Sequence, residues 1–111
     1  MAVDPSFREF VLEQLGEITP VRARSMFGSV GIYAGGLFFA IISEDTLYFK
    51  VDHTNRPDYE AAGMAAFAPY ADPSRTLGFY EVPGELLEDP DRLRPWVERA
   101  IEAAAGKRRA R

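Results

Sequence analysis

The sequence predicts an α+β domain, a two-layer structure in which an antiparallel sheet carries helices on one face. Three observations support this fold class. Apolar residues recur at helical spacing near both ends of the chain, the segment after Pro20 changes to short runs typical of strands, and hairpin-length gaps separate the first four runs. Such gaps exclude parallel pairing, because a parallel connection needs about a dozen residues or more. We therefore expect one domain over residues 1–105, followed by a flexible basic tail at 106–111.

The first helix is predicted to begin at Asp4-Pro5 and to end near Gly16. Asp is a favoured N-cap residue and Pro suits the first helical position, so the pair is typical of a helix start. The apolar stripe of this helix, at spacings of three and four residues, consists of Phe7, Phe10, Val11, Leu15 and Ile18.

Strands are predicted next, and turn-forming residues separate them. The expected strands are Val21–Phe27, Val30–Ala34, Leu37–Ser43 and Thr46–Val51. Gly28 and Gly31 are expected to supply positive φ angles at the first turn, and Gly35-Gly36 at the second. A phosphate-binding loop does not explain these glycines, because it needs a Lys-Ser or Lys-Thr pair that opens a helix. Here a strand follows instead.

The run from Leu37 to Ile42 is apolar at every position. Leu37, Phe39 and Ile41 are expected on one face of the strand, and Phe38, Ala40 and Ile42 on the other. A strand with two apolar faces is typical of the middle of a sheet, where both faces are covered. We therefore place this strand at the centre.

The sheet face opposite the helices is predicted to be aromatic. Leu47, Phe49 and Val51 share one face of their strand, and Tyr48 and Lys50 share the other. The second face is then expected to carry Phe38, Ile42, Tyr48 and Tyr80, with Tyr33 beside them. Such a surface is too apolar to remain fully wet, so it indicates either a binding partner or cover from the loop Met64–Ser74.

The second half of the chain is predicted to contain two helices and a strand. Asn55 can cap a short helix that runs to about Ala62, with Gly63 as its stop. The segment "AAFAPYADPSR" is expected to be a loop whose prolines prevent regular pairing, and Arg75–Val82 is expected to be a strand. The final helix should begin at Asp89-Pro90, and its apolar stripe consists of Leu93, Trp96, Val97, Ala100, Ile101 and Ala104.

Residues for catalysis or metal binding are scarce. The chain has one His and no Cys, which excludes disulfides and cysteine metal sites. His53 lies near Asp52, Asp58 and Glu60, but a turn before a helix collects such residues without any site. The acidic residues before the last helix, where the helix dipole favours negative charge, are Glu85, Glu88, Asp89 and Asp91. We therefore expect no catalytic residue, metal site or cofactor.

The charge distribution argues against specific DNA binding. The net charge is −4, but four of the thirteen basic residues lie in the tail "GKRRAR". The rest of the chain has nine basic and seventeen acidic residues, a net charge of −8, which would repel a phosphate backbone. No apolar run is long enough to cross a membrane and the first residues do not form a signal peptide, so a cytoplasmic location is expected.

Several segments together carry a family resemblance: "RARSMFGSVGIYAGGLFFAIISEDTLYFKVD", "RPDYEAAG", "FAPY" and "FYEVPGELLEDPDRLRPWVERAIEAA". They resemble the TfoX N-terminal domain family, also called TfoX/Sxy, over nearly the whole chain. The motif residues, which we interpret as mainly structural, are Arg24, Met26, Phe27, Gly28, Gly31 and Tyr33.

This resemblance implies a two-layer α+β domain, similar to a secretion-chaperone-like fold, in a cytoplasmic bacterial protein. Members of the family are linked to the regulation of natural competence genes, and the better-known members carry a second, C-terminal domain. The chain would therefore be a stand-alone N-terminal domain. The family offers no established catalytic residues to carry over.

The sequence leads to one main hypothesis and two alternatives. The main hypothesis is a non-enzymatic regulatory or adaptor domain that binds a protein partner, or a second copy of itself, through Phe38, Tyr48, Lys50 and Tyr80. One alternative is a domain that binds a small molecule or anion between the sheet and the loop Met64–Ser74, with Arg24 or Lys50 as the cation. Direct DNA binding is the third hypothesis.

Overall fold

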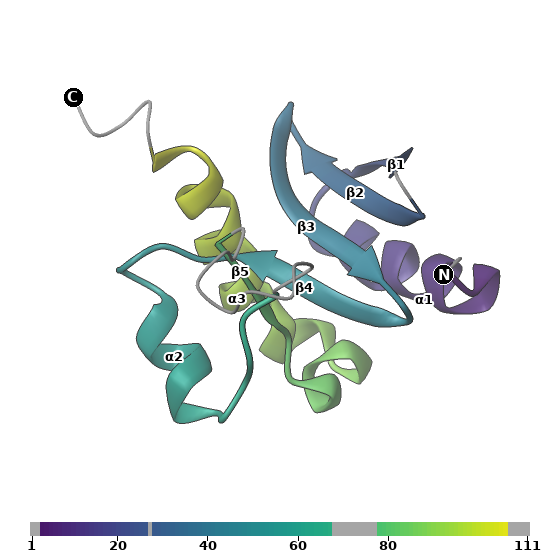
Figure 1. Cartoon of the computed structure of the whole chain (residues 1–111). Helices are drawn as coiled ribbons and strands as arrows, with labels where there is room; N and C mark the ends of the chain where they lie inside the picture. Colours follow the sequence, from purple (N-terminus) through teal and green to yellow (C-terminus); the bar gives the residue numbers. More distant parts are fainter. Residues whose placement is uncertain (1–2, 27, 68–77, 107–111) are drawn as a thin grey trace.

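The structure, a computed structural model, describes residues 3–26, 28–67 and 78–106. Its strands form one antiparallel sheet against which helices pack, so the predicted α+β fold class is confirmed (Figure 1). The elements are α1 (Pro5–Gly16), β1 (Arg22–Met26), β2 (Ser29–Ala34), β3 (Leu37–Ser43), β4 (Thr46–Lys50), α2 (Arg56–Ala61), β5 (Phe79–Glu81), the 3-10 helix η1 (Gly84–Glu88) and α3 (Pro90–Ala104). Within the described ranges, no helix is long and apolar enough to span a membrane.

The sheet is a meander with the strand order β1-β2-β3-β4-β5, and each strand pairs antiparallel with the next. The apolar strand β3 lies at the centre, as its two apolar faces predict. Gly28 (φ 81°) and Gly35-Gly36 (φ 55° and 82°) adopt the expected positive φ angles at the turns. Gly31 does not, because it lies inside β2 opposite Arg24 and Ile41. The prediction that Gly31 serves a turn is therefore wrong.

The helices α1 and α3 cover one face of the sheet and lie behind it in Figure 1. α3 lies against β3 and β4 and also contacts α1. The apolar stripe of α3 therefore meets the sheet, and the buried Val11 and Leu15 of α1 belong to the same core. The main buried residues of this core are Val11, Leu15, Val30, Ile32, Phe39, Ala40, Ile42, Leu47, Phe49, Leu93, Val97 and Ala100.

Of the two Asp-Pro helix starts, only the second has a side-chain N-cap. The Asp89 side chain accepts a hydrogen bond from the Arg92 backbone N–H at 3.4 Å, so Asp89 is the N-cap of α3. Asp4 occupies the N-cap position of α1, but its side chain makes no capping hydrogen bond. Its backbone N–H instead donates to Asp45 Oδ1 at 2.9 Å. The start of α1 is thereby tied to the turn between β3 and β4.

A bulge in β3 decides which side chains face the helices. Ile32 pairs with Ala40 and Tyr33 pairs with Phe38, so Phe39 has no partner on β2. A bulge residue interrupts the two-residue alternation of a strand. Phe39 and Ala40 consequently both lie in the core, and each is 0% exposed.

The predicted composition of the second sheet face is partly wrong, because the bulge in β3 reverses the side of Ile42 and because Tyr80 of β5 lies on the other side of the sheet. Ile42 pairs with Leu47 and Tyr80 pairs with Phe49, and both partners belong to the core. Tyr80 also contacts the buried ring of Tyr59, at 5.8 Å between centroids. Ile42 and Tyr80 therefore face the helices.

The segment before β5 was also predicted incompletely. Residues 65–67 pair alongside β5, because the Phe67 backbone N–H donates to the Phe79 carbonyl at 2.7 Å and Ala66 bridges to Tyr80. Part of the predicted loop is therefore an additional extended segment at this edge of the sheet. Of the predicted strand 75–82, the structure describes β5 at 79–81, and residues 75–77 lie outside the described residues.

Candidate functional site

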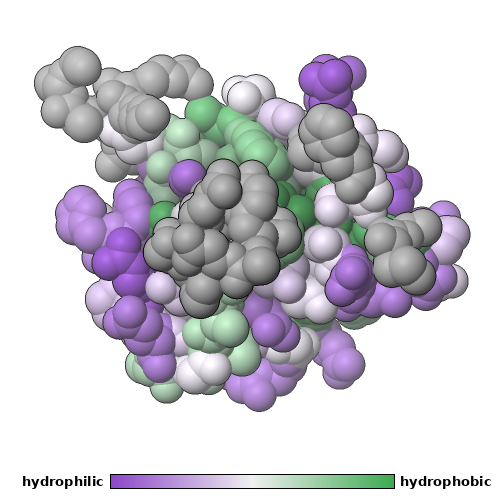
Figure 2. All heavy atoms as spheres, in the orientation of Figure 1, coloured by the Kyte–Doolittle hydropathy of each residue, from purple (hydrophilic) through white to green (hydrophobic). Residues whose placement is uncertain are grey.

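An aromatic cluster covers the sheet face that lies opposite α1 and α3. We call this surface the outer face and define it by Tyr33, Phe38, Tyr48, Lys50, Phe67 and Phe79. Ring centroids of Tyr33 and Phe38 lie 5.1 Å apart, and those of Phe38 and Phe79 lie 5.3 Å apart. Figure 2 views this side of the molecule and shows hydrophobic side chains in green among hydrophilic ones in purple. The rings come from β2, β3, β4 and β5 and from the segment 65–67 that pairs alongside β5, so the sheet itself positions the cluster.

The outer face also carries polar groups beside the rings. Lys50 pairs with Phe79 across β4 and β5, and its Nζ lies 5.2 Å from the centre of that ring. Tyr48 contacts Phe67 at 4.5 Å between centroids and pairs with Glu81. Burial, and then the nearby Glu81 carboxylate, raise the pKa of Tyr48. The face therefore combines apolar area with a hydroxyl, an ammonium and a carboxylate that can orient a bound molecule.

A pair of arginines lies at the edge of this face. Arg22 pairs with Tyr33 and Arg24 pairs with Gly31, so both arginines belong to the outer side of β1. Both are exposed, and neither forms an ion pair within the described part of the chain. A hollow of about 480 Å³ opens here, and its lining residues are Arg22, Ala23, Arg24, Tyr33 and Gly36.

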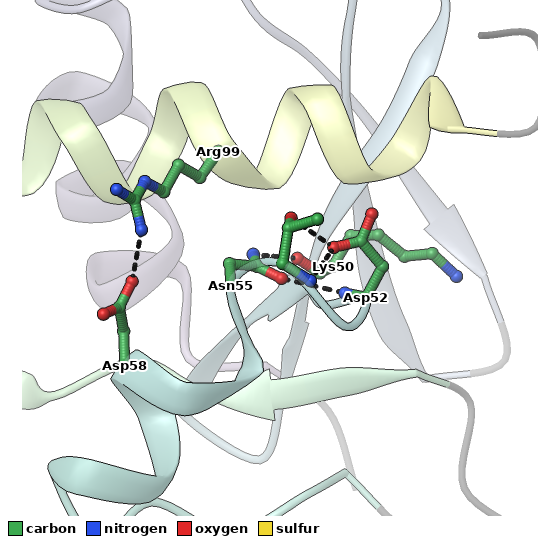
Figure 3. A network of polar contacts seen from close by, with 6 residues as sticks. Lys50, Asp52, Asn55, Asp58 and Arg99 are labelled. Carbon is green, nitrogen blue, oxygen red and sulfur yellow. Dashed lines mark hydrogen bonds and ion pairs between the residues drawn. The ribbon is translucent and has the colours of Figure 1, made fainter. Parts of the chain in front are cut away.

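A polar network joins the end of β4 to α2 (Figure 3). Asn55 Oδ1 accepts from the Asp52 backbone N–H at 2.8 Å, and Asn55 Nδ2 donates to the Lys50 carbonyl at 3.1 Å. Asn55 is 1% exposed and makes no side-chain cap of α2. Asn55 therefore occupies the predicted N-cap position of α2, but the prediction that its side chain caps the helix is wrong, because its amide holds the preceding turn instead.

The helices α2 and α3 are joined by an ion pair. Arg99 Nη1 lies 2.7 Å from Asp58 Oδ2, and the two side chains point toward each other in Figure 3. Beside this pair is a hollow of about 210 Å³, lined by Asn55, Asp58, Tyr59, Pro95, Trp96 and Arg99. The Tyr59 and Trp96 rings meet edge to face at 4.8 Å, which rigidifies the apolar wall of the hollow.

Tyr59 carries a buried hydroxyl that has no hydrogen-bond partner in the part of the chain that the structure describes. Tyr59→Phe should therefore raise the free energy of unfolding by about 1 to 2 kcal/mol, because it removes an unsatisfied buried polar group. Urea denaturation at pH 7 measures this change. The matched control is Tyr33→Phe on the half-buried outer face, for which we expect about 0.5 kcal/mol or less. A loss of stability in Tyr59→Phe would show that the hydroxyl has a partner.

The same substitution should alter the response to alkali. Burial, and then the neighbouring Asp58 carboxylate, raise the pKa of Tyr59 well above its ordinary value. Above about pH 10 the unfolded state therefore loses the phenolic proton while the folded state keeps it, so the free energy of unfolding falls as the pH rises. Phenylalanine cannot ionise. We therefore expect Tyr59→Phe to lose less stability than the wild type above this pH.

His53 lies in the turn between β4 and α2, next to a set of side-chain hydrogen bonds. Asp52 Oδ1 accepts hydrogen bonds from the Thr54 backbone N–H at 2.9 Å and from Thr54 Oγ1 at 2.6 Å. Burial opposes ionisation of Asp52, but the Thr54 hydrogen bonds, with a smaller contribution from His53, outweigh it and lower the pKa of this carboxyl. Within the described residues, no cluster of His, Asp and Glu could hold a metal ion.

The structure brings together three of the four predicted partner-binding residues. Phe38, Tyr48 and Lys50 lie on the outer face, whereas Tyr80 lies on the side of the helices. Sequence reasoning missed Phe67 and Phe79 as members of this face. For Phe79 the sequence offered a signal, because Phe79 alternates with the polar Glu81 and therefore shares its side of the strand. For Phe67 it offered none, because this residue belongs to a segment that was predicted to be a loop.

The predicted motif residues cluster around the first hairpin. Arg24 and Met26 belong to β1, Gly31 and Tyr33 belong to β2, and Gly28 lies in the turn between them. Phe27 lies outside the described residues, as do residues 68–74 of the loop Met64–Ser74 and residues 107–111 of the tail.

Comparison with known proteins finds one family. The family model described as "TfoX N-terminal domain" matches residues 13–104, which cover the last four residues of α1, the whole sheet, α2, η1 and α3. A search of curated proteins found no match.

Proposed function

Because this chain belongs to the TfoX N-terminal domain family, we propose that it is a non-enzymatic regulatory or adaptor domain that binds another protein through its outer face. The observation that carries this proposal is the aromatic cluster on the sheet face opposite the helices. Four rings of this cluster, those of Tyr33, Phe38, Tyr48 and Phe67, are half-buried, whereas Phe79 is 4% exposed. Half-buried aromatic rings beside polar groups are the side chains that protein interfaces favour.

The residue types on the outer face support protein binding over catalysis. Tyr33 and Tyr48 each supply a large ring and a hydroxyl, and Lys50 supplies a cation that a carboxylate of the partner could meet. The contacts within the cluster hold the rings in place before a partner arrives, which lowers the entropy that binding must overcome. A rigid aromatic surface of this kind suits recognition.

One observation favours the binding of a small anion as a second candidate function. The hollow beside Arg22 and Arg24 has room for a small molecule and two cationic side chains at its wall. A metabolite that binds there would raise the melting temperature of the protein, and the rise would grow with the ratio of its free concentration to its Kd. If the ligand still raises the melting temperature of Tyr48→Glu but no longer raises that of Arg24→Glu, the anion site lies at the arginines and not on the outer face.

Site-specific crosslinking tests the proposed function. A photoreactive phenylalanine replaces Tyr48 in cells that naturally make the protein, and the matched control carries it at Glu98, which is exposed on α3. We expect Tyr48 to give a crosslinked protein of defined mass that Glu98 does not give. The purified partner should then bind Lys50→Glu about tenfold more weakly than wild type, and Arg94→Glu normally.

Equal crosslinking from Tyr48 and Glu98, or equal binding of the partner to Lys50→Glu and wild type, would contradict the proposal. Lys50→Glu and Arg94→Glu change the net charge by the same amount, so a difference between them reports on position rather than on overall charge.

A further inference from the structure

The two edges of the sheet are not equally protected. At one end, residues 65–67 pair alongside β5. At the other end β1 is the last strand, and within the described residues its backbone groups bond only to β2. An open edge strand presents a row of free N–H and C=O groups to which an extended chain can add by β-pairing.

The side chains of this edge indicate the charge of the added chain. Arg22 and Arg24 are two residues apart, so they project to the same side of β1. Both side chains are exposed. Within the described residues, neither arginine forms an ion pair. A strand laid beside β1 would place alternate side chains next to these arginines, and opposite charges at such positions stabilise the pairing.

The hollow at the same edge supplies space for those side chains. Tyr33 and Gly36 line it together with both arginines. A Cβ atom built on Gly36 would meet nothing within 4 Å, so this end of the hollow is open. A carboxylate could therefore reach the guanidinium groups while the rest of its side chain lies against the Tyr33 ring.

We propose that β1 binds an extended acidic segment of another protein, which adds to the sheet as a further strand and carries carboxylates two residues apart. This inference rests on the proposed function and names the partner chemistry that goes with it. A second copy of the chain does not fit as well. An antiparallel copy of β1 centred on Arg24 would place this arginine opposite its own counterpart, and like charges in that position are destabilising.

A designed peptide tests the proposal. The probe is an acetylated and amidated hexapeptide, Glu-Val-Glu-Val-Glu-Val, added to isotope-labelled protein and followed by the amide NMR signals. We expect the largest shift changes within Arg22–Met26 and slowed hydrogen exchange there. Arg22→Glu with Arg24→Glu should weaken binding about tenfold or more, whereas Arg94→Glu on α3 should change it by about twofold at most.

Two further peptides separate strand pairing from simple attraction. A Lys-Val peptide of the same length should bind the double variant better than the wild type, which also shows that the variant is folded. A Glu-Val peptide with an N-methyl group on every backbone amide should lose binding, because neither of its edges can donate to the hydrogen-bonded ladder. Unchanged binding of the methylated peptide, no shifts in Arg22–Met26, or a wild-type dimer in sedimentation that Arg22→Glu with Arg24→Glu abolishes would each overturn the inference.

Failure here is distinguishable from failure of the proposed function. The crosslinking experiment uses Tyr48 on β4 and does not depend on β1. If Tyr48 crosslinks a partner while the acidic peptide leaves β1 unchanged, only the strand-addition proposal falls.

Discussion

Phe39→Ala is expected to lower the free energy of unfolding by about 3 to 5 kcal/mol, the usual cost of truncating a fully buried phenylalanine. Phe39 is 0% exposed and lies 5.8 Å from the Phe49 ring, in the layer between β3 and the helices. Its neighbours are held by the sheet and cannot collapse fully into the cavity. Urea denaturation, with the slope of the transition compared to that of wild type, measures the change.

The adjacent residue provides a matched control. Phe38 lies on the outer face and is half-buried, so Phe38→Ala should cost only about 1 to 2 kcal/mol. The two substitutions remove the same atoms from neighbouring positions. A larger loss in Phe38→Ala than in Phe39→Ala would mean that the bulge is misplaced and that Phe39 does not face the helices.

The position of β3 in the sheet could be predicted from the sequence, but the bulge could not. The run from Leu37 to Ile42 is apolar at every position, which requires cover on both faces and therefore a central strand. For the same reason, no polar residue in the run marks where its alternation is interrupted. A strict period of two was therefore applied across Phe39, and it assigned Ile42 to the wrong face.

The outer face shows a second limit of sequence reasoning. Tyr48 and Lys50 were placed correctly because Leu47 and Phe49 define the core side of β4. The contact between Phe67 and Tyr48 joins residues that are far apart in the sequence, and no periodicity reports such a contact. In β5 each face carries an aromatic residue, and only the alternation of Phe79 with polar Glu81, and of Tyr80 with apolar Val82, signals that Phe79 lies outward.

Side-chain hydrogen bonds were the least predictable feature. Asn55 stands where a helix begins, and its residue type is typical of an N-cap. In the folded chain its amide bonds backward, to Lys50 and Asp52, rather than forward to the helix. Residue type alone does not distinguish these two uses of one amide, because both satisfy backbone groups beside a turn.

Replacement of Asn55 is expected to have the second large effect on stability. Asn55→Ala removes two hydrogen bonds and leaves the Asp52 N–H and the Lys50 carbonyl without their partner, at a cost of about 2 to 4 kcal/mol. Thr54→Ala, at an exposed neighbouring position, should cost about 1 kcal/mol or less. Urea denaturation of both variants measures the difference, and similar losses would mean that the Asn55 amide does not hold the turn.

Asn55→Asp separates the two hydrogen bonds without changing the shape of the side chain. An aspartate can still accept from the Asp52 N–H, but when ionised it cannot donate to the Lys50 carbonyl and its charge is buried beside that oxygen. The pKa of the new carboxyl should therefore be raised in the folded state.

The folded Asn55→Asp protein then binds the proton more tightly than the unfolded chain, so part of the lost stability should return as the pH falls from 7 toward 5. Asn55→Ala has no proton to gain and should show no such recovery, and equal pH profiles for the two variants would contradict the role of the donated bond.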